Sequence, residues 1–224
     1  MAKKRIWISA DHGLALVYFL QSDVIKTFLD AGVEVVLLTD DGIQEQINSR
    51  FGCPGLQFEG LRMEQARAYN EQVARERQWW LYFFRRAGAS NRINTVALES
   101  YISQVTAESS TRRRLLLPLG KLGIAILRRS RAARQQVVSM QQRFSPDLYQ
   151  DLFTRLPPDL VIASTPGWRL DSYLLREAAR RRIKTAAVIV GWDNPSSYSL
   201  PGAPVDWITC WSEIQKQENL TLRK

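Results

Sequence analysis

The sequence is poor in the residues that build disulfide frameworks and metal centres. Its 224 residues include two cysteines and one histidine. Cys53 and Cys210 lie far apart, and neither belongs to a CxxC or mixed Cys/His pattern with metal-ligand spacing. We therefore expect no metal site, and we expect both cysteines to be small buried apolar residues, as free cysteines usually are.

Long apolar runs are absent as well. No stretch reaches the roughly 18 to 20 apolar residues that a membrane-spanning helix needs. The start of the chain, Met-Ala-Lys-Lys-Arg, has the charge of a signal peptide, but Asp11 and His12 interrupt the apolar run behind it and no small-residue cleavage site follows. We expect a cytoplasmic protein, either soluble or peripheral at the inner face of the cell membrane.

The chain also lacks the glycine-rich loops that cradle phosphates. The turn after the first expected strand, residues 9–16, has one glycine where a dinucleotide-binding GxGxxG turn has three. A nucleotide-binding P-loop sequence, GxxxxGK followed by Ser or Thr, does not occur either. These absences argue against a dinucleotide cofactor held by the first turn.

What the chain does have is ample apolar material and a large excess of positive charge. Hydrophobic residues make up 45% of the sequence, enough for a sizeable core. The formal net charge is +9 and the isoelectric point is near 9.9. Such an excess suits an anionic partner, and at this level a lipid surface, a nucleic acid and a phosphorylated substrate all remain open.

Six apolar runs of strand length predict a sheet. The first two are too apolar to have a solvated face, which indicates parallel strands buried on both sides. Helical periodicities separate most of the runs, so we predict an α/β fold: a doubly wound (Rossmann-like), mostly parallel six-stranded sheet with strand order 3-2-1-4-5-6 and a long helical insertion after the third strand. The expected strands are residues 5–10, 33–39, 56–58, 159–165, 184–190 and 205–211, and the expected helices beside them are 14–31, 43–51, 168–182 and a last one that Ser212 caps.

The chain is expected to form a single domain. Residues 1–60 and 157–224 would make the sheet core, and residues 61–156 would make the helical insertion. Within the insertion, helical periods predict long helices at 62–86, 94–107 and 112–143.

Arginine clusters flank an apolar segment of the insertion, residues 115–127. Two interpretations are open. The segment is either part of a solvated helical hairpin whose apolar stripe packs on the sheet domain, or an interfacial segment that binds anionic lipid headgroups. Nucleic acid is the least favoured partner, because the aromatic residues are clumped rather than interleaved with basic ones and no recognised binding motif is present.

Three loops follow expected strands near the switch point between the first and fourth strands, where open α/β sheets place ligands. They contain residues 11–13, 164–168 and 191–194. His12 is the only histidine and the best candidate for a general base, because an imidazole exchanges a proton near neutral pH. The alternative is a surface turn histidine without a role.

Other residues of these loops have a structural and a functional interpretation. Asp11 and Asp193 could orient a base or hold sugar hydroxyls, although aspartate is also a common turn former. Trp192 offers a stacking face beside Asp193. Pro195 is expected to block any helix in the third loop. Trp7 and Trp207 fall inside expected strands, and we expect both in the core.

The third loop, Gly-Trp-Asp-Asn-Pro-Ser at positions 191–196, resembles a Ser-Trp-Asp-Asn-Leu-Thr motif. That motif follows the fifth strand in bacterial surface-polysaccharide glycosyltransferases of the GT-B fold. Residues 205–216 are similar to the next strand and helix of the same family. Gly191 stands where the family has serine, and Pro195-Ser196 stands where it has Leu-Thr, which changes the polar contacts available to the loop.

This resemblance implies roles for particular residues. In such enzymes the N-terminal domain receives the acceptor and often supplies a base from the loop after the first strand, which implicates His12 as the catalytic base and Asp11 or Asp193 as its partner. A second α/β domain binds the nucleotide-sugar donor, and this chain, which ends at Lys224, is expected to lack it. The implied substrate-binding residues are Gly13, Thr165, Trp192, Asp193, Asn194 and Ser196.

The resemblance thus implies the acceptor-binding half of a nucleotide-sugar-dependent glycosyltransferase for cell-surface polysaccharide or glycolipid, inactive without its donor domain. The nucleotide sugar would be a co-substrate, with no other cofactor and no metal. The expected partners are a sugar or lipid-linked acceptor, a donor domain or donor subunit, and an anionic membrane surface. The alternatives are a non-catalytic glycan- or protein-binding module and the acceptor subunit of a two-component glycosyltransferase.

Overall fold

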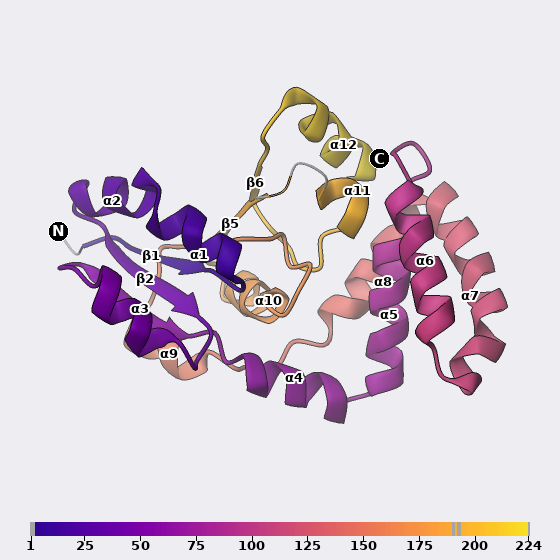
Figure 1. Cartoon of the computed structure of the whole chain (residues 1–224), viewed down its shortest axis with the longest axis horizontal. Coiled ribbons are helices and arrows are strands. Elements are labelled where there is room, and N and C mark those ends of the chain that lie inside the picture. The colour runs from indigo at the N-terminus through magenta and orange to yellow at the C-terminus, as the bar shows by residue number, and fades with distance from the viewer. Residues whose placement is uncertain (1–2, 190, 192–193, 224) are drawn as a thin grey trace. The chain divides into compact units, whose positions relative to one another are not determined.

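Two compact units make up the computed structural model, which describes residues 3–189, 191 and 194–223 (Figure 1). Residues 1–73, 145–190 and 203–209 are here named the sheet unit, and residues 74–144, 191–202 and 210–224 the helical unit. The sheet unit contains β1 (Arg5–Ser9), α1 (Gly13–Leu20), α2 (Asp23–Asp30), β2 (Glu34–Thr39), α3 (Gln44–Phe51), β3 (Leu56–Gly60), α4 (Met63–Gln72), α9 (Gln150–Arg155), β4 (Leu160–Ala163), α10 (Ser172–Arg180), β5 (Lys184–Val188) and β6 (Trp207–Thr209). The helical unit contains α5 (Arg75–Ala87), α6 (Val96–Glu108), α7 (Thr111–Arg129), α8 (Arg131–Gln142), α11 (Asn194–Tyr198) and α12 (Glu213–Arg223).

The sheet has six parallel strands in the order β3-β2-β1-β4-β5-β6. Strand β1 lies between β2 and β4, with Ile6 opposite both Val35 and Leu160. The predicted fold class is therefore confirmed, including the strand order and the helical insertion after β3. The switch point, where open sheets of this kind bind ligands, lies between β1 and β4.

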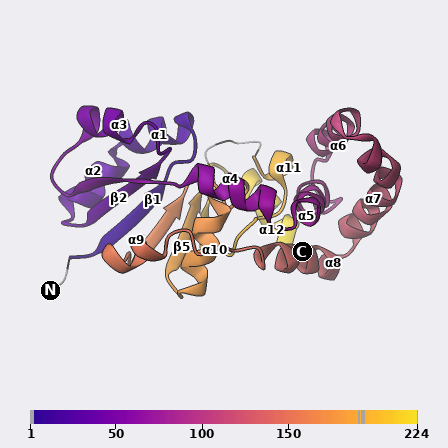
Figure 2. The same ribbon diagram turned by 90° about the horizontal axis from the view of Figure 1, so that it is seen from below.

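Both faces of this sheet are buried, as the apolar strands predict. On one face, Ile8 packs in a core with Phe19 of α1. On the other face, Trp7 contacts Phe153 of α9, with ring centroids 4.4 Å apart, and shares a core with Leu174 of α10. Figure 2 shows α1 and α2 on one side of the strands and α9 and α10 on the other.

Two expected helices are each divided by a capping serine. The expected helix 14–31 is two helices, α1 and α2, because the Ser22 hydroxyl accepts a hydrogen bond from a backbone N–H in the first turn of α2. The expected helix 112–143 is divided at Ser130 in the same way, and its hydroxyl accepts a first-turn N–H of α8. Helical periodicity does not reveal such divisions, because it continues through the caps.

Two further helices differ from expectation. The expected helix 62–86 is divided between α4 and α5 at Ala74, which has a left-handed backbone with φ 47°. The expected helix 168–182 begins at Ser172 instead, so residues 168–171 extend the loop after β4. This second difference changes the composition of the candidate site.

Several residue-level expectations are wrong. Cys53 and Cys210 are exposed rather than buried, because they lie in the turn before β3 and directly after the edge strand β6. Trp207 is 55% exposed for the same reason, since β6 has only β5 beside it, whereas Trp7 is in the core as expected. Pro195 lies within α11 instead of preventing it, because the first turn of a helix does not need the N–H that proline lacks.

An aromatic core holds the helices of the helical unit together. Phe83 of α5 is fully buried in a cluster with Ile102 of α6 and Leu117 of α7. Helix α7 approaches α5 closely at Gly120, where an added Cβ would lie 2.9 Å from Cζ3 of Trp80. Any side chain at position 120 would therefore require the Trp80 ring to shift within a packed core.

Candidate active site

The switch point of the sheet unit brings two loops together. Residues 10–12 follow β1 and lead into α1, and residues 164–171 follow β4 and lead into α10. The last residue of β1, Ser9, is paired with the last residue of β4, Ala163, so the two loops begin side by side.

Asp11, His12 and Ser164 form one hydrogen-bonded group. Oδ1 of Asp11 lies 2.6 Å from Nδ1 of His12 and accepts a hydrogen bond from Oγ of Ser164 at 2.8 Å. The Asp11 side chain is fully buried, whereas 23% of the His12 side chain is exposed. Because Nδ1 faces a carboxylate, it carries the proton of the neutral imidazole, and the lone pair is on Nε2. The geometry thus leaves Nε2 of His12 as the ring nitrogen that can accept a proton.

Asp11 has a second partner, since Nε of Arg169 lies 3.2 Å from its Oδ2. Burial by itself would raise the pKa of Asp11. The hydrogen bonds from His12 and Ser164, together with the charges of His12 and Arg169, outweigh burial and hold this pKa below its ordinary value. Asp11 is therefore a buried, ionised carboxylate next to the imidazole, positioned to stabilise positive charge on it.

A second carboxyl group, Asp171, is fully buried in the same loop. Its Oδ2 accepts a hydrogen bond from Oγ1 of Thr165 at 2.6 Å, and its Oδ1 accepts one from the backbone N–H of Arg169 at 3.3 Å. Burial, and then the negative charge of Asp11, raise the pKa of Asp171 to about 8. Environments that separate the pKa values of neighbouring acids give them different roles, here an ionised Asp11 and a neutral Asp171 at pH 7.

The sequence-predicted residues of these two loops are brought together to different degrees. Asp11 and His12 are in direct contact. Thr165 lies in the neighbouring loop, where it is buried and its hydroxyl holds Asp171. Gly13 begins α1 and is exposed, and an added Cβ there would meet no atom within 4 Å. Space is therefore open directly after the histidine.

Helix α1 continues from this point with exposed apolar side chains. Leu14 and Val17 are 53% and 44% exposed, and their spacing places them on one face of the helix. His12 is the N-cap residue of α1 and makes no side-chain cap, so its imidazole remains committed to Asp11. The Asp11–His12 pair therefore lies next to an open apolar surface on α1.

The third predicted loop is not part of this unit. Trp192 and Asp193 lie outside the described residues. Asn194 is the first residue of α11 and Ser196 lies within it, and α11 belongs to the helical unit. Their role in substrate binding stays a prediction.

Sequence reasoning misses Arg169 and Asp171. The apolar periodicity of α10 can be extended back to Trp168 in the sequence, which hides the last part of the loop in an expected helix. The pair Asp171-Ser172 has the composition of a helix start. A helix start at this pair would have placed Arg169 and Asp171 in the loop before α10.

Within the described ranges, no group of three or more His, Cys, Asp or Glu side chains is arranged to hold a metal ion. No protein-family model, curated protein or solved structure matches the chain. The fold is therefore the level at which the protein is placed: a parallel six-stranded, Rossmann-like α/β domain with a helical insertion. Many enzymes have this architecture, so function must be argued from the site.

Proposed function

We propose that this protein is the acceptor-binding half of a nucleotide-sugar-dependent glycosyltransferase. The observation that carries the proposal is the Asp11–His12 pair at the carboxyl end of β1, joined through Nδ1 at 2.6 Å. The glycosyltransferases that the sequence resembles supply their base from the same loop. The Trp-Asp-Asn motif after β5 supports the same family of reactions.

In the proposed reaction an acceptor hydroxyl lies against Nε2 of His12. The hydroxyl proton moves to Nε2 while the oxygen forms a bond to the anomeric carbon of the donor sugar. The bond from that carbon to the nucleoside diphosphate breaks, and the diphosphate leaves with the bonding electrons. Asp11 stabilises the imidazolium that forms. Ser164 and Arg169 hold the Asp11 carboxylate in position for this step.

The surface next to the base favours an acceptor with an apolar part. Leu14 and Val17 follow His12 directly on α1 and leave aliphatic surface open to solvent. Ligand sites combine such apolar walls with a few polar groups that fix orientation. A lipid-linked acceptor fits this combination better than a fully polar glycan.

The donor is proposed to bind elsewhere. Neither a GxGxxG turn nor a P-loop occurs in the chain, and the first βα turn contains His12 in place of a phosphate-cradling sequence. A second α/β domain or a separate subunit would hold the nucleotide sugar and complete the active site.

The test is a sugar-transfer assay on the complete enzyme, the chain together with its donor half, with lipid-linked acceptors. His12→Ala is expected to lower kcat by about 10²–10⁴-fold, the usual worth of a positioned base, with little change in KM. Lys26→Ala changes an exposed residue of α2 in the same unit and is expected to keep full activity.

Two results would contradict the proposal. Full activity of the His12→Ala enzyme would show that another group is the base. Tight acceptor binding by the wild-type protein without sugar transfer in the presence of any donor half would identify a binding module instead.

A further inference from the structure

Helix α7 carries a row of aliphatic side chains on the face that it does not pack. Leu115, Leu119, Leu122 and Ile126 are between 56% and 77% exposed. Their spacing of four, three and four residues places them on one side of the helix. We name these four residues the leucine stripe. The opposite side of α7 is already packed in the helical unit, so the stripe is a second apolar face on one helix.

Basic residues border the leucine stripe. Two of the α7 arginines have acidic partners, since Arg113 pairs with Glu76 and Arg128 with Glu99. Four other cations of this helix have no carboxylate within ion-pair distance among the residues that the structure describes; they are Arg112, Arg114, Lys121 and Arg129. Within the described part of the chain, Arg114 and Arg129 donate only to backbone carbonyls of Ala107 and Ala125, so their positive charges are not neutralised by a carboxylate at ion-pair distance.

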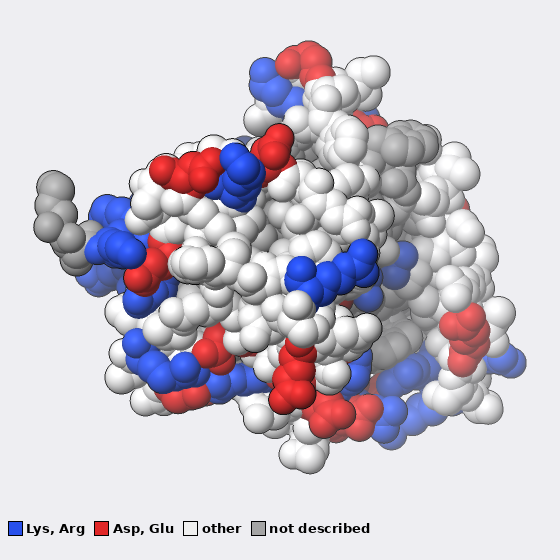
Figure 3. All heavy atoms as spheres, turned by 60° about the vertical axis from the view of Figure 1, so that its left-hand side comes forward, with Lys and Arg blue, Asp and Glu red and all other residues white. Residues whose placement is uncertain are grey.

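The positive charge of the protein is concentrated in the unit that contains α7. The sheet unit has 14 basic and 16 acidic residues, whereas the helical unit has 17 basic and 6 acidic residues. Figure 3 views the side of the molecule that carries α2 and α3, where basic and acidic side chains are interspersed. The formal charge of +9 thus arises from the helical unit alone.

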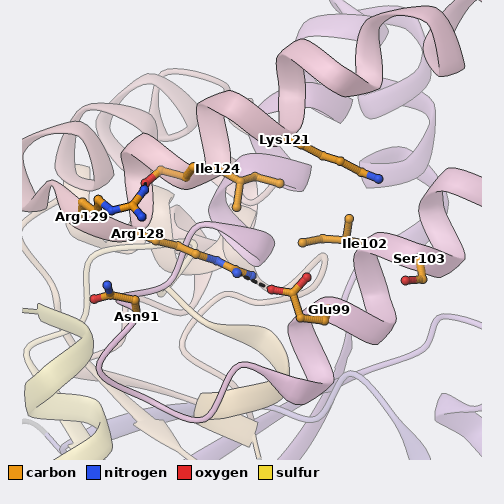
Figure 4. A pocket seen from close by; sticks show the side chains of 9 residues that line it. Asn91, Glu99, Ile102, Ser103, Lys121, Ile124, Arg128 and Arg129 are labelled. Carbon is orange, nitrogen blue, oxygen red and sulfur yellow. Dashed lines mark hydrogen bonds and ion pairs between the residues drawn. The ribbon is translucent and has the colours of Figure 1, made fainter.

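A pocket of about 380 Å³ opens between α6 and α7. Figure 4 shows the Arg128 side chain crossing it to Glu99, with Lys121 on the same helix facing the α6 side. Arg129 also lines this pocket. The pocket exceeds the volume of a water molecule, about 30 Å³, many times over and has room for a phosphate group.

We infer that α7 is a lipid-docking surface: the leucine stripe enters the boundary between headgroups and acyl chains of a bilayer, and the four cations without a carboxylate partner among the described residues contact anionic headgroups. Apolar burial with a basic border is the pattern of a helix that lies in a membrane interface. No helix among the described residues is long and apolar enough to cross a membrane, so the contact is peripheral.

A second copy of the chain suits this face less well. A symmetric dimer through the stripe would bring the same basic border of both copies together, and facing like charges oppose association. An anionic lipid surface satisfies the stripe and its border at once. This inference goes beyond the proposed sugar transfer and holds whether or not His12 is a base.

The test is co-sedimentation of the full chain with vesicles of phosphatidylcholine alone and of phosphatidylcholine mixed with phosphatidylglycerol. Wild-type protein is expected to bind the mixed vesicles and to bind the neutral ones far more weakly. Leu119→Ser combined with Leu122→Ser is expected to abolish most of this binding. Val96→Ser is the matched control, because Val96 is 73% exposed on α6 and lies outside the stripe.

The contribution of the basic border is tested by comparing substitutions of border arginines with the substitution of an arginine elsewhere. Arg112→Gln and Arg129→Gln are each expected to weaken binding to the mixed vesicles about fivefold, the effect of one basic residue near an anionic surface. Arg67→Gln removes the same charge from an exposed position in the sheet unit and is expected to leave binding unchanged. Circular dichroism of every variant checks that the helical content is retained.

Three outcomes would overturn the inference. One is equal binding to neutral and mixed vesicles, and another is equal loss of binding in the stripe and control variants. The third is a wild-type dimer in analytical ultracentrifugation that the stripe substitutions convert to a monomer without vesicle binding, which would assign the surface to a second copy of the chain.

Discussion

The imidazole of His12 has two ring nitrogens, and its neighbour Asp11 determines which of them can take a proton. A carboxylate can only accept a hydrogen bond, so Nδ1 must donate and Nε2 must carry the lone pair. The buried position of Asp11 matters here, because Ser164 and Arg169 hold its carboxylate in one orientation. Asp11, held in place by Ser164 and Arg169, thus determines that Nε2 is the nitrogen of His12 that can accept a proton.

Asp11→Asn is expected to reverse this assignment. A carboxamide can donate to Nδ1, which leaves the ring proton on Nε2 and removes the base from the open side. Because the chain has a single histidine, NMR of isotope-labelled histidine reports on this residue alone. We expect an Nδ1–H form in the wild type, an Nε2–H form in the variant, and a loss of transfer activity of about 10⁴-fold, as for other histidines held in the wrong tautomer. An unchanged Nδ1–H signal in the variant would refute the assignment.

The buried Asp171 makes stability depend on pH. Its pKa is raised to about 8 in the folded protein from an ordinary value of 3.8, so between these values the folded state holds a proton that the unfolded chain releases. The free energy of unfolding therefore falls as pH rises through this window, by at most about 1.4 kcal/mol per pH unit for one proton. Asp171→Asn is expected to remove this slope, measured by denaturant unfolding across the window.

Asp206→Asn provides the control for this slope. The hydrogen bond from Lys184, together with those from Thr185, lowers the pKa of Asp206 below its ordinary value, so this carboxyl titrates below the window. Its replacement is expected to change stability by a constant amount without changing the slope. A slope that persists in the Asp171→Asn protein would show that another group takes up the proton.

At the residue scale, the sequence indicates His12 as a candidate base because it is the only histidine and follows an expected strand. It does not predict Asp171, since burial of a carboxyl group is a property of the folded loop. The same limit applies to Cys53 and Trp207, which have apolar side chains but lie at positions that the fold leaves exposed to solvent.

At the scale of elements, helix and strand types are predicted well and helix ends poorly. Apolar strands such as 33–39 can only fit a sheet that is covered on both faces, which is why a parallel sheet is predictable. The strand order follows from the doubly wound arrangement of such strands with helices between them. Two long periodic segments are divided at Ser22 and Ser130, where one side-chain hydroxyl satisfies the start of a new helix. A local cap of this kind leaves the periodic pattern intact.

The crossing of α5 and α7 gives a prediction at this scale. Gly120→Leu would place a side chain where Trp80 already lies within 2.9 Å of the Cβ position. We expect the free energy of unfolding to fall by about 1–3 kcal/mol through overpacking, although leucine is the better helix former. Lys121→Leu adds the same side chain at the next, exposed position and is expected to change stability by less than about 0.5 kcal/mol. Equal effects of both substitutions in denaturant unfolding would exclude a packing cause.

At the scale of the whole molecule, the two units are not continuous in sequence. Residues 191–202 and 210–224 follow strands of the sheet, yet they belong to the helical unit. The separate segments of the helical unit are joined by contacts such as the hydrogen bond that Nη1 of Arg85 donates to the carbonyl of Leu200. These two residues are 115 positions apart. This contact does not appear in the helical or strand periodicity of either segment, so sequence patterns predict the sheet but not the division into two units.

Two units with separate cores should respond separately to a core mutation. Phe83 is buried in the aromatic core of the helical unit, and Phe153 is buried under the sheet. Phe83→Ala is expected to destabilise α5 to α8 by about 3–5 kcal/mol, seen as faster amide hydrogen exchange in these helices while β1 and β2 keep their protection. Phe153→Ala is the reciprocal variant and is expected to accelerate exchange in the sheet. Uniform acceleration in both proteins would instead indicate one cooperative unit, and the two cores would then have to be treated as a single folding domain.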